Sequence, residues 1–100
     1  MLILKKKIIS ILSNIFDPEI TINIYELGLL YDLRIRKKNI IIIIMTLTTP
    51  HCPVAERFTK IIKQKLFHIY YVKKVYVILT FFPNWTSQFM SEFARLELGV

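Results

Sequence analysis

A run of six apolar residues, IIIIIM at positions 40–45, restricts the possible folds of this chain more than any other feature. The run is far shorter than the roughly 20 residues that a helix needs to cross a bilayer. A continuous apolar run of this length is typical of a strand that is covered on both faces. We therefore expect residues 40–45 at the centre of a sheet, in a protein that does not cross a membrane.

Two further segments have the residue pattern of strands. The segment LGLLYDLRI at 27–35 precedes the central run, and the polar residues 36–39 between them predict a hairpin. The segment VKKVYVILTFF at 72–82 predicts a third strand that ends before Pro83. Gly28 lies at the start of the first segment, where we expect unusual backbone angles or a close approach of another part of the chain.

Apolar residues recur at helical spacing in three other segments, which cover about the first fifteen residues, 54–69 and 86–98. The first helix must stop before Pro18, in a turn that displays Asp17 and Glu19. For the last helix, TSQFMSEFARLEL, we expect Thr86 as the N-cap and Gly99 just past the end.

The expected order is therefore αββαβα, in one small domain that covers residues 1–100. The helix between the second and third strands must cross over the sheet, so these two strands should be parallel, whereas the hairpin is antiparallel. We predict a two-layer α/β (α+β) fold, with a three-stranded mixed sheet and helices mainly on one face.

The chain carries a formal net charge of +7, which raises the question of a nucleic-acid partner. Its basic residues are dispersed, and aromatic residues do not interleave with them as a single-strand stacking platform requires. A solvated basic surface is the favoured interpretation. The opening MLILKKKIISIL does not have the order of a secretory signal, and a single cysteine fits the cytoplasm, so we predict a cytoplasmic protein.

That cysteine, Cys52, lies between Pro50 and Pro53 in the segment TLTTPHCPVAERF. Pro53 suits the first position of a helix, which puts Cys52 at or next to the N-cap. Unpaired amides and the helix dipole at this point favour the thiolate and can lower the pKa of the thiol. The other interpretation is a small buried residue, because free cysteine is among the most often buried side chains. Both interpretations stay open from position alone.

Catalysis by a cysteine-histidine pair is not expected from these residues. A nucleophilic cysteine needs a histidine base within hydrogen-bond reach. His68 is sixteen residues further along the same predicted helix, about 24 Å away at 1.5 Å per residue. His51 is adjacent to Cys52, but neighbours in sequence need not bring their side chains together.

A complete metal site is not expected either, because zinc and the common iron-sulfur clusters take about four ligands. The chain offers one thiol, two separated histidines and scattered carboxylates. A thiolate-bound cluster would have to be shared, and a symmetric homodimer could place two Cys52 side chains together. Such a site would be exposed and would suit transfer rather than storage.

The chain resembles the SufT and PaaD-like family of small accessory proteins of iron-sulfur cluster assembly. The segments that carry the resemblance are DPEITINIYELGLLYDLRI, MTLTTPHCPVAE and NWTSQFMSEFARLELG, in this order. The resemblance covers nearly the whole chain beyond the first helix. It implies the αββαβα domain and places one set of residues around a single site, namely Asp17, Glu19, Thr48, Thr49 and Cys52.

His51 departs from the family pattern, in which a small residue often precedes the cysteine; it is kept as a residue that shapes the site. The resemblance implies a non-enzymatic accessory factor that works with iron-sulfur assembly proteins and client apoproteins. Its cargo would be a transient iron-sulfur cluster or iron on Cys52, with no permanently bound cofactor. The alternative is a PaaD-like interaction module that supports an oxygenase system, with a structural cysteine.

Overall fold

The predicted central strand is the middle strand of a sheet in the computed structural model of this chain. The structure describes residues 2–16, 22–48 and 52–99, with the backbone alone at 2 and 52–55. Its main elements run in the predicted order αββαβα: α1 (Leu2–Leu12), β1 (Leu30–Arg36), β2 (Ile40–Met45), α2 (Cys52–Phe67), β3 (Lys74–Leu79) and α3 (Glu92–Leu98). None of the helices in the described ranges is both long and apolar enough to span a bilayer.

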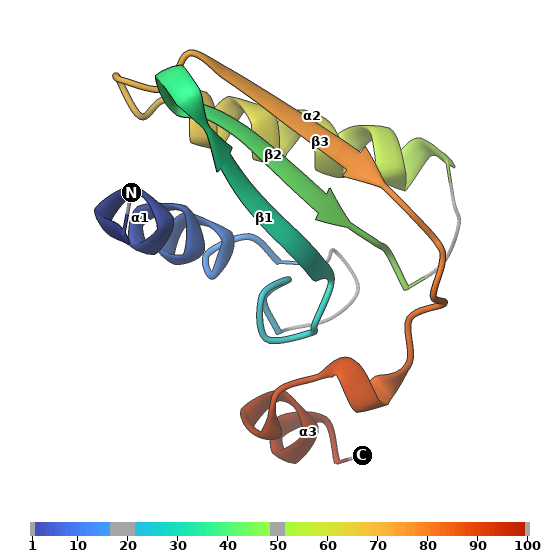
Figure 1. The fold of residues 1–100 in the computed structure, drawn as a ribbon. Helices are drawn as coiled ribbons and strands as arrows, with labels where there is room; N and C mark the ends of the chain where they lie inside the picture. The colour runs from blue at the N-terminus through green and yellow to red at the C-terminus, as the bar shows by residue number, and fades with distance from the viewer. Residues whose placement is uncertain (1, 17–21, 49–51, 100) are drawn as a thin grey trace.

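The sheet has the strand order β1-β2-β3 and is mixed, as predicted (Figure 1). β1 and β2 are antiparallel, and the turn between them is a short 3-10 segment with positive φ angles of 62° at Lys38 and 57° at Asn39. β2 and β3 are parallel because α2 carries the chain back across the sheet between them. The carboxyl ends of β2 and β3 therefore lie at the same end of the sheet.

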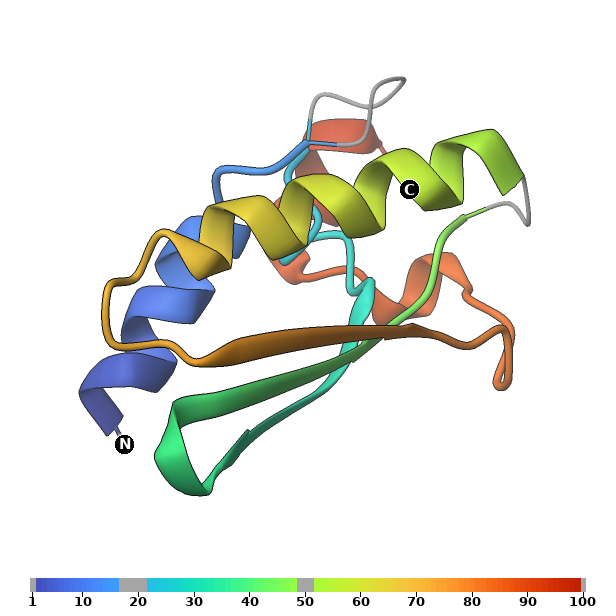
Figure 2. The ribbon, with the colours of Figure 1, turned by 90° about the horizontal axis from the view of Figure 1, so that it is seen from above.

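The two longer helices, α1 and α2, lie on one side of the sheet (Figure 2). Burial alternates along β2, where Ile41, Ile43 and Met45 are buried and the residues between them are only half-buried. The buried set faces the helices and joins one hydrophobic core with α1 residues Leu4, Ile8 and Leu12 and α2 residues Phe58, Ile62 and Leu66. Among the described elements no helix lies over the opposite face of the sheet (Figure 2), so the apolar run at 40–45 is covered on one face and not on both.

The C-terminal segment differs from its prediction, because it forms two short elements in place of one helix. Thr86 caps a 3-10 turn at Ser87–Phe89, where its hydroxyl accepts a hydrogen bond from the amide of Gln88. α3 begins at Glu92, and Ser91 is its N-cap, with the hydroxyl accepting from the amide of Ala94. The amide of Ser91 also donates to the carbonyl oxygen of Glu26 at 2.8 Å, which holds this residue outside the helix.

Gly28 fulfils both expectations for its position. Its φ angle is +78°, in the left-handed region that residues with a Cβ rarely adopt. A Cβ built on Gly28 would lie only 2.1 Å from the carbonyl oxygen of Phe89, in the segment that precedes α3. The C-terminal segment can therefore pack against the entry to β1 only because residue 28 has no side chain.

Candidate functional site

The candidate site begins where β2 ends and α2 starts. Residues Thr46, Leu47 and Thr48 follow β2, and α2 begins at Cys52. The prediction that Cys52 lies at a helix start is confirmed, with the helix beginning one residue before Pro53. In the first turn of a helix the backbone amides have no intrahelical acceptor, and the dipole presents its positive end. This environment favours an anion, including a cysteine thiolate.

Thr46 anchors the loop that leads to Cys52. Its side chain is completely buried, and its backbone amide donates to the carbonyl oxygen of Leu29 at 2.9 Å. A buried hydroxyl needs a hydrogen-bond partner, and the Thr46 hydroxyl has the carbonyl oxygen of Leu47 at 3.4 Å. The sequence analysis singled out Thr48 and Thr49 but not Thr46, because burial of one threonine in a run of three is not visible from composition.

The chain on either side of residues 17–21 is tied to this same loop. Phe16 and Asn23 form an isolated antiparallel bridge, and the amide of Ile24 donates to the carbonyl oxygen of Ile15 at 2.8 Å. The amide of Leu29 in turn donates to the carbonyl oxygen of Ile24 at 3.2 Å. Since Leu29 also accepts from Thr46, backbone hydrogen bonds connect residues 15–16 and 23–24 with the end of β2.

Asp17, Glu19, Thr49 and His51 lie outside the described residues. Their convergence on Cys52, which the family resemblance implies, therefore stays a prediction. Thr48 is described and is half-buried. Within the described ranges, no group of three or more His, Cys, Asp or Glu residues could hold a metal ion.

A Cys52–His68 pair within one subunit is incompatible with the fold. α2 has sixteen residues, so its two ends are about 24 Å apart, and His68 follows the last residue of the helix. His68 instead lies beside β3, in a groove that it shares with Lys63 and Phe67. The sequence argument against this catalytic pair is confirmed by the length of the helix.

Trp85, in the third segment of the resemblance, has a structural role. Its indole Nε1 donates to the carbonyl oxygen of Leu27 at 2.8 Å, next to Gly28. Tyr31 in β1 also contacts the C-terminal segment. Its hydroxyl donates to the carbonyl oxygen of Pro83 at 2.9 Å, and its ring packs edge-on against Phe89. Sequence reasoning missed Tyr31, since nothing local links it to residues more than fifty positions away.

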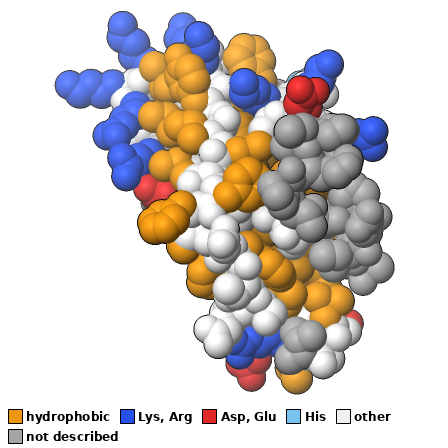
Figure 3. Space-filling view, turned by 90° about the vertical axis from the view of Figure 1, so that its right-hand side faces the viewer, with side chains coloured by type: hydrophobic (Ala, Val, Ile, Leu, Met, Phe, Trp, Pro, Cys, Tyr) orange, Lys and Arg blue, Asp and Glu red, His pale blue; other side chains and the backbone are white. Residues whose placement is uncertain are grey.

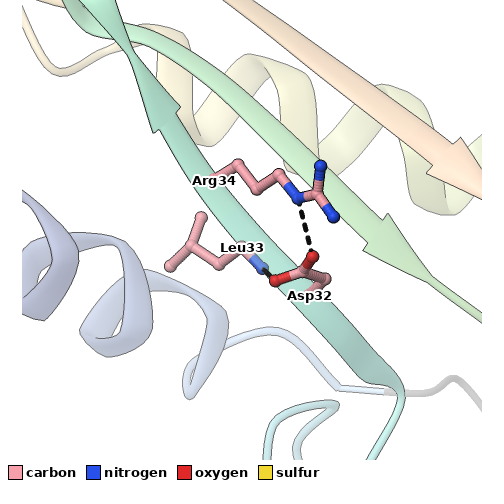
Figure 4. A network of polar contacts seen from close by, with 3 residues as sticks. All are labelled: Asp32, Leu33 and Arg34. Carbon is pink, nitrogen blue, oxygen red and sulfur yellow. Dashed lines mark hydrogen bonds and ion pairs between the residues drawn. The ribbon is translucent and has the colours of Figure 1, made fainter.

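Two side chains of β1 form an ion pair on the open face of the sheet (Figure 4). Arg34 Nε lies 2.8 Å from Asp32 Oδ2, and the amide of Leu33 donates to Asp32 Oδ1 at 2.8 Å. The hydrogen bond from Arg34, then the Leu33 amide and the charges of Arg34 and Arg36, lower the pKa of Asp32. This lowering outweighs the opposing effect of desolvation.

We therefore expect the pKa of Asp32, measured by NMR titration of its carboxyl carbon, to lie below that of aspartate in a peptide. Arg34→Gln should raise the pKa toward the peptide value, and Arg36→Gln should raise it less, because Arg36 acts through charge alone. A lowered folded-state pKa stabilises the fold above the unfolded pKa, and this contribution disappears as pH falls through the folded pKa. Equal shifts in the two variants would contradict the assignment to the hydrogen bond.

Comparison with known proteins identifies the family. Residues 5–77 match the family model described as "Iron-sulfur cluster assembly protein". The chain belongs to this family. The match begins in α1 and ends in β3, so it includes both segments that flank Cys52 and the whole sheet up to Val77.

Individual proteins match more of the chain than the family model does. A Porphyromonas gingivalis protein named "Fe-S protein maturation auxiliary factor" is 39% identical over 95% of this chain and 90% of its own length. The Staphylococcus aureus "Fe-S protein maturation auxiliary factor SufT" is 33% identical over 86% of this chain and 98% of its own. These matches confirm the SufT-like resemblance.

A solved structure confirms the fold. The crystal structure of a domain of unknown function from Bacillus anthracis superimposes with a TM-score of 0.89 at 30% identity. The superposition covers 99% of this chain and 94% of the Bacillus anthracis chain. The agreement therefore extends over the C-terminal segment beyond residue 77.

Proposed function

We propose that this protein is an auxiliary factor for the maturation of iron-sulfur proteins, with no catalytic activity of its own. Membership of the iron-sulfur cluster assembly family carries the proposal, and relatives that match most of the chain are named as maturation factors. Its partners are the assembly machinery that supplies iron or clusters and the apoproteins that receive them.

Cys52 is the residue through which the protein acts in this proposal. Its position at the start of α2 supports a thiolate, which is the form that binds iron. The thiolate holds iron or an iron-sulfur cluster transiently as cargo, or contacts the protein that holds it. Asp17, Glu19, Thr48, Thr49 and His51 shape its surroundings.

One chain supplies a single thiolate, so the remaining cluster ligands come from elsewhere. A second copy of the chain, a partner protein or a small thiol can complete the set of about four. Such a shared site opens when any of these groups leaves. Transfer of the cargo to a client is then a ligand exchange, in which ligands of the client also replace the Cys52 thiolate on the iron.

The function is tested by maturation of a client apoprotein, supplied with iron, sulfide and a scaffold under anaerobic conditions, with and without this protein. We expect faster or more complete recovery of client cluster absorbance and activity when the protein is present. No difference at any ratio of protein to client, over several clients, would contradict the proposed function.

The reactivity of the thiol is a separate prediction. We expect alkylation of Cys52 by iodoacetamide to reach half of its maximal rate at a lower pH in the folded protein than in the same chain unfolded in urea. The reason is that the amides and dipole at the start of α2 stabilise the thiolate only in the fold. Coinciding profiles, or slower labelling when folded, would favour a structural cysteine in an interaction module.

A further inference from the structure

β3 is an edge strand whose outer side is unpaired among the described elements. It is the last strand in the order β1-β2-β3, and Figure 2 looks onto it with no other element in front. The amide of Thr80 donates to the carbonyl oxygen of Met45 at 2.9 Å. Because alternate residues of a parallel strand bond to the same neighbour, Val75, Val77 and Leu79 direct their N–H and C=O groups away from β2.

Next to this edge, the open face of the sheet is apolar. Ile42 pairs with Tyr76 and Ile44 pairs with Ile78, and the two β3 side chains are 43% and 49% exposed. Figure 3 shows hydrophobic side chains gathered in a band on the side toward which β2 and β3 run, with Lys and Arg side chains grouped at its upper left. A strand added beside β3 would extend this apolar face.

On the helix side of the same edge, an open groove of about 620 Å³ lies between α2 and β3. It is lined by Lys63, Gln64, Phe67, His68, Lys74 and Val75, with no acidic residue among them. The one ion pair between described residues is Arg34–Asp32, so neither Lys63 nor Lys74 has a described carboxylate within 4.0 Å. The groove therefore combines an exposed aromatic ring, Phe67, with unneutralised positive charge.

We propose that the edge of β3 receives an extended segment of a partner protein in which acidic and apolar residues alternate. Side chains of a strand point alternately to its two faces. The acidic ones would reach Lys63 on the helix side, and the apolar ones would cover Tyr76 and Ile78 on the open face. Main-chain hydrogen bonds to Val75 and Val77 supply the register, as in other cases of strand addition.

A second copy of this chain is a poorer occupant of the edge. Two copies paired along this edge would bring like charges together, because Lys63 and Lys74 line the groove beside it and no acidic residue does. Lys73 and Lys74 at the start of β3 are residues of the kind that protect natural edge strands from self-pairing. The same charges attract an acidic segment. Since β2 and β3 run toward the end of the sheet where α2 begins, a segment bound here has one end on the side of Cys52.

The probe for this surface is a fluorescein-labelled peptide of alternating Glu and Val, measured by fluorescence anisotropy with the full chain. We expect saturable binding that weakens as salt rises. Two control peptides should not bind. One alternates Lys and Val, and the other has the same Glu and Val composition as the probe but in the order Glu-Glu-Val-Val. Two further peptides are N-methylated at every second amide, one at the odd and one at the even positions. Only one of these sets faces β3, so one peptide should lose binding and the other should keep it.

Variants of the protein test the same edge of β3. Lys63→Glu with Lys74→Glu should weaken the alternating peptide by at least about tenfold. Val77→Pro removes an outward amide without removing a hydrogen bond to β2 and should abolish binding, whereas Val77→Thr keeps the amide and should bind normally. If the proline variant does not fold, the lysine variants and the N-methylated peptides decide the question.

Cys52→Ala should bind the peptide as the unchanged chain does, because residue 52 belongs neither to β3 nor to the lining of the groove. Binding that ignores salt, the lysine reversals and N-methylation would overturn the proposal. A chain that sediments as a dimer, becomes monomeric in Val77→Pro and fails to bind the peptide would overturn it too, and would assign the edge to a second copy.

Discussion

Cys52→Ala is expected to reduce client maturation to the level measured without the protein, while the domain stays folded. The chain has no other cysteine, so the variant removes every thiolate that could hold iron. The fold should tolerate the change, because alanine is a good helix former and α2 begins at this residue. The measurement is the rate of cluster transfer to a client apoprotein in the anaerobic reconstitution, with circular dichroism to check folding.

Cys52→Ser is the matched control for size and polarity, and it should fail as the alanine variant does, because a hydroxyl at neutral pH is not a thiolate. Thr59→Ala, which removes a half-buried hydroxyl that bonds only within the same helix, should leave maturation unchanged. Full maturation with Cys52→Ala would remove the thiol from the mechanism. Loss of cluster binding alone would not distinguish a carrier from an adaptor, so client maturation is the deciding readout.

Gly28→Ala is expected to cost more stability than the same change at Gly99, the other glycine of the chain. Residue 28 has a φ angle of +78°, which costs a residue with a Cβ about 1–2 kcal/mol. The added carbon would also lie 2.1 Å from the carbonyl oxygen of Phe89, which is backbone and cannot rotate away. The two effects together should cost about 3 kcal/mol or more, at the high end for one substitution.

For a domain of this size such a loss lowers the midpoint of thermal unfolding by roughly 12–24 °C. Gly99→Ala is the control, because Gly99 has a similar φ of +72° at the end of α3 but nothing within 4 Å of a built Cβ. It should cost about 1 kcal/mol, from backbone strain alone. Equal losses in the two variants would show that contact with Phe89 does not matter.

Several features of the fold were predictable because their signals are local. The apolar run 40–45 indicated a central strand, and it is the middle of the sheet. Helical spacing predicted α1 and α2, and the need for a crossover predicted the parallel pairing of β2 and β3. The last helix was placed too early, because Phe89 and Met90 continue the apolar spacing although they lie before the Ser91 cap.

The candidate site was predictable in only one part. The proline that follows Cys52 is a local helix-start signal, and α2 does begin at the cysteine. The gathering of other groups around it depends on pairings between distant segments, such as the hydrogen bond from Thr46 to Leu29. No local pattern specifies which backbone groups meet across such separations.

The sequence by itself therefore determined the order and type of the main elements, the apolar stripes of α1 and α2, and the position of the single thiol at a helix start. Periodicity and turn residues suffice for this, because backbone angles and the spacing of apolar residues depend on a few neighbours along the chain. Only the tertiary structure decided that Trp85 and Tyr31 fasten the C-terminal segment over Gly28, and that β3 keeps an open edge between an apolar face and the Lys63 groove. Those features exist only once the sheet has formed, because each brings together residues that are far apart along the chain. No local sequence pattern specifies such contacts.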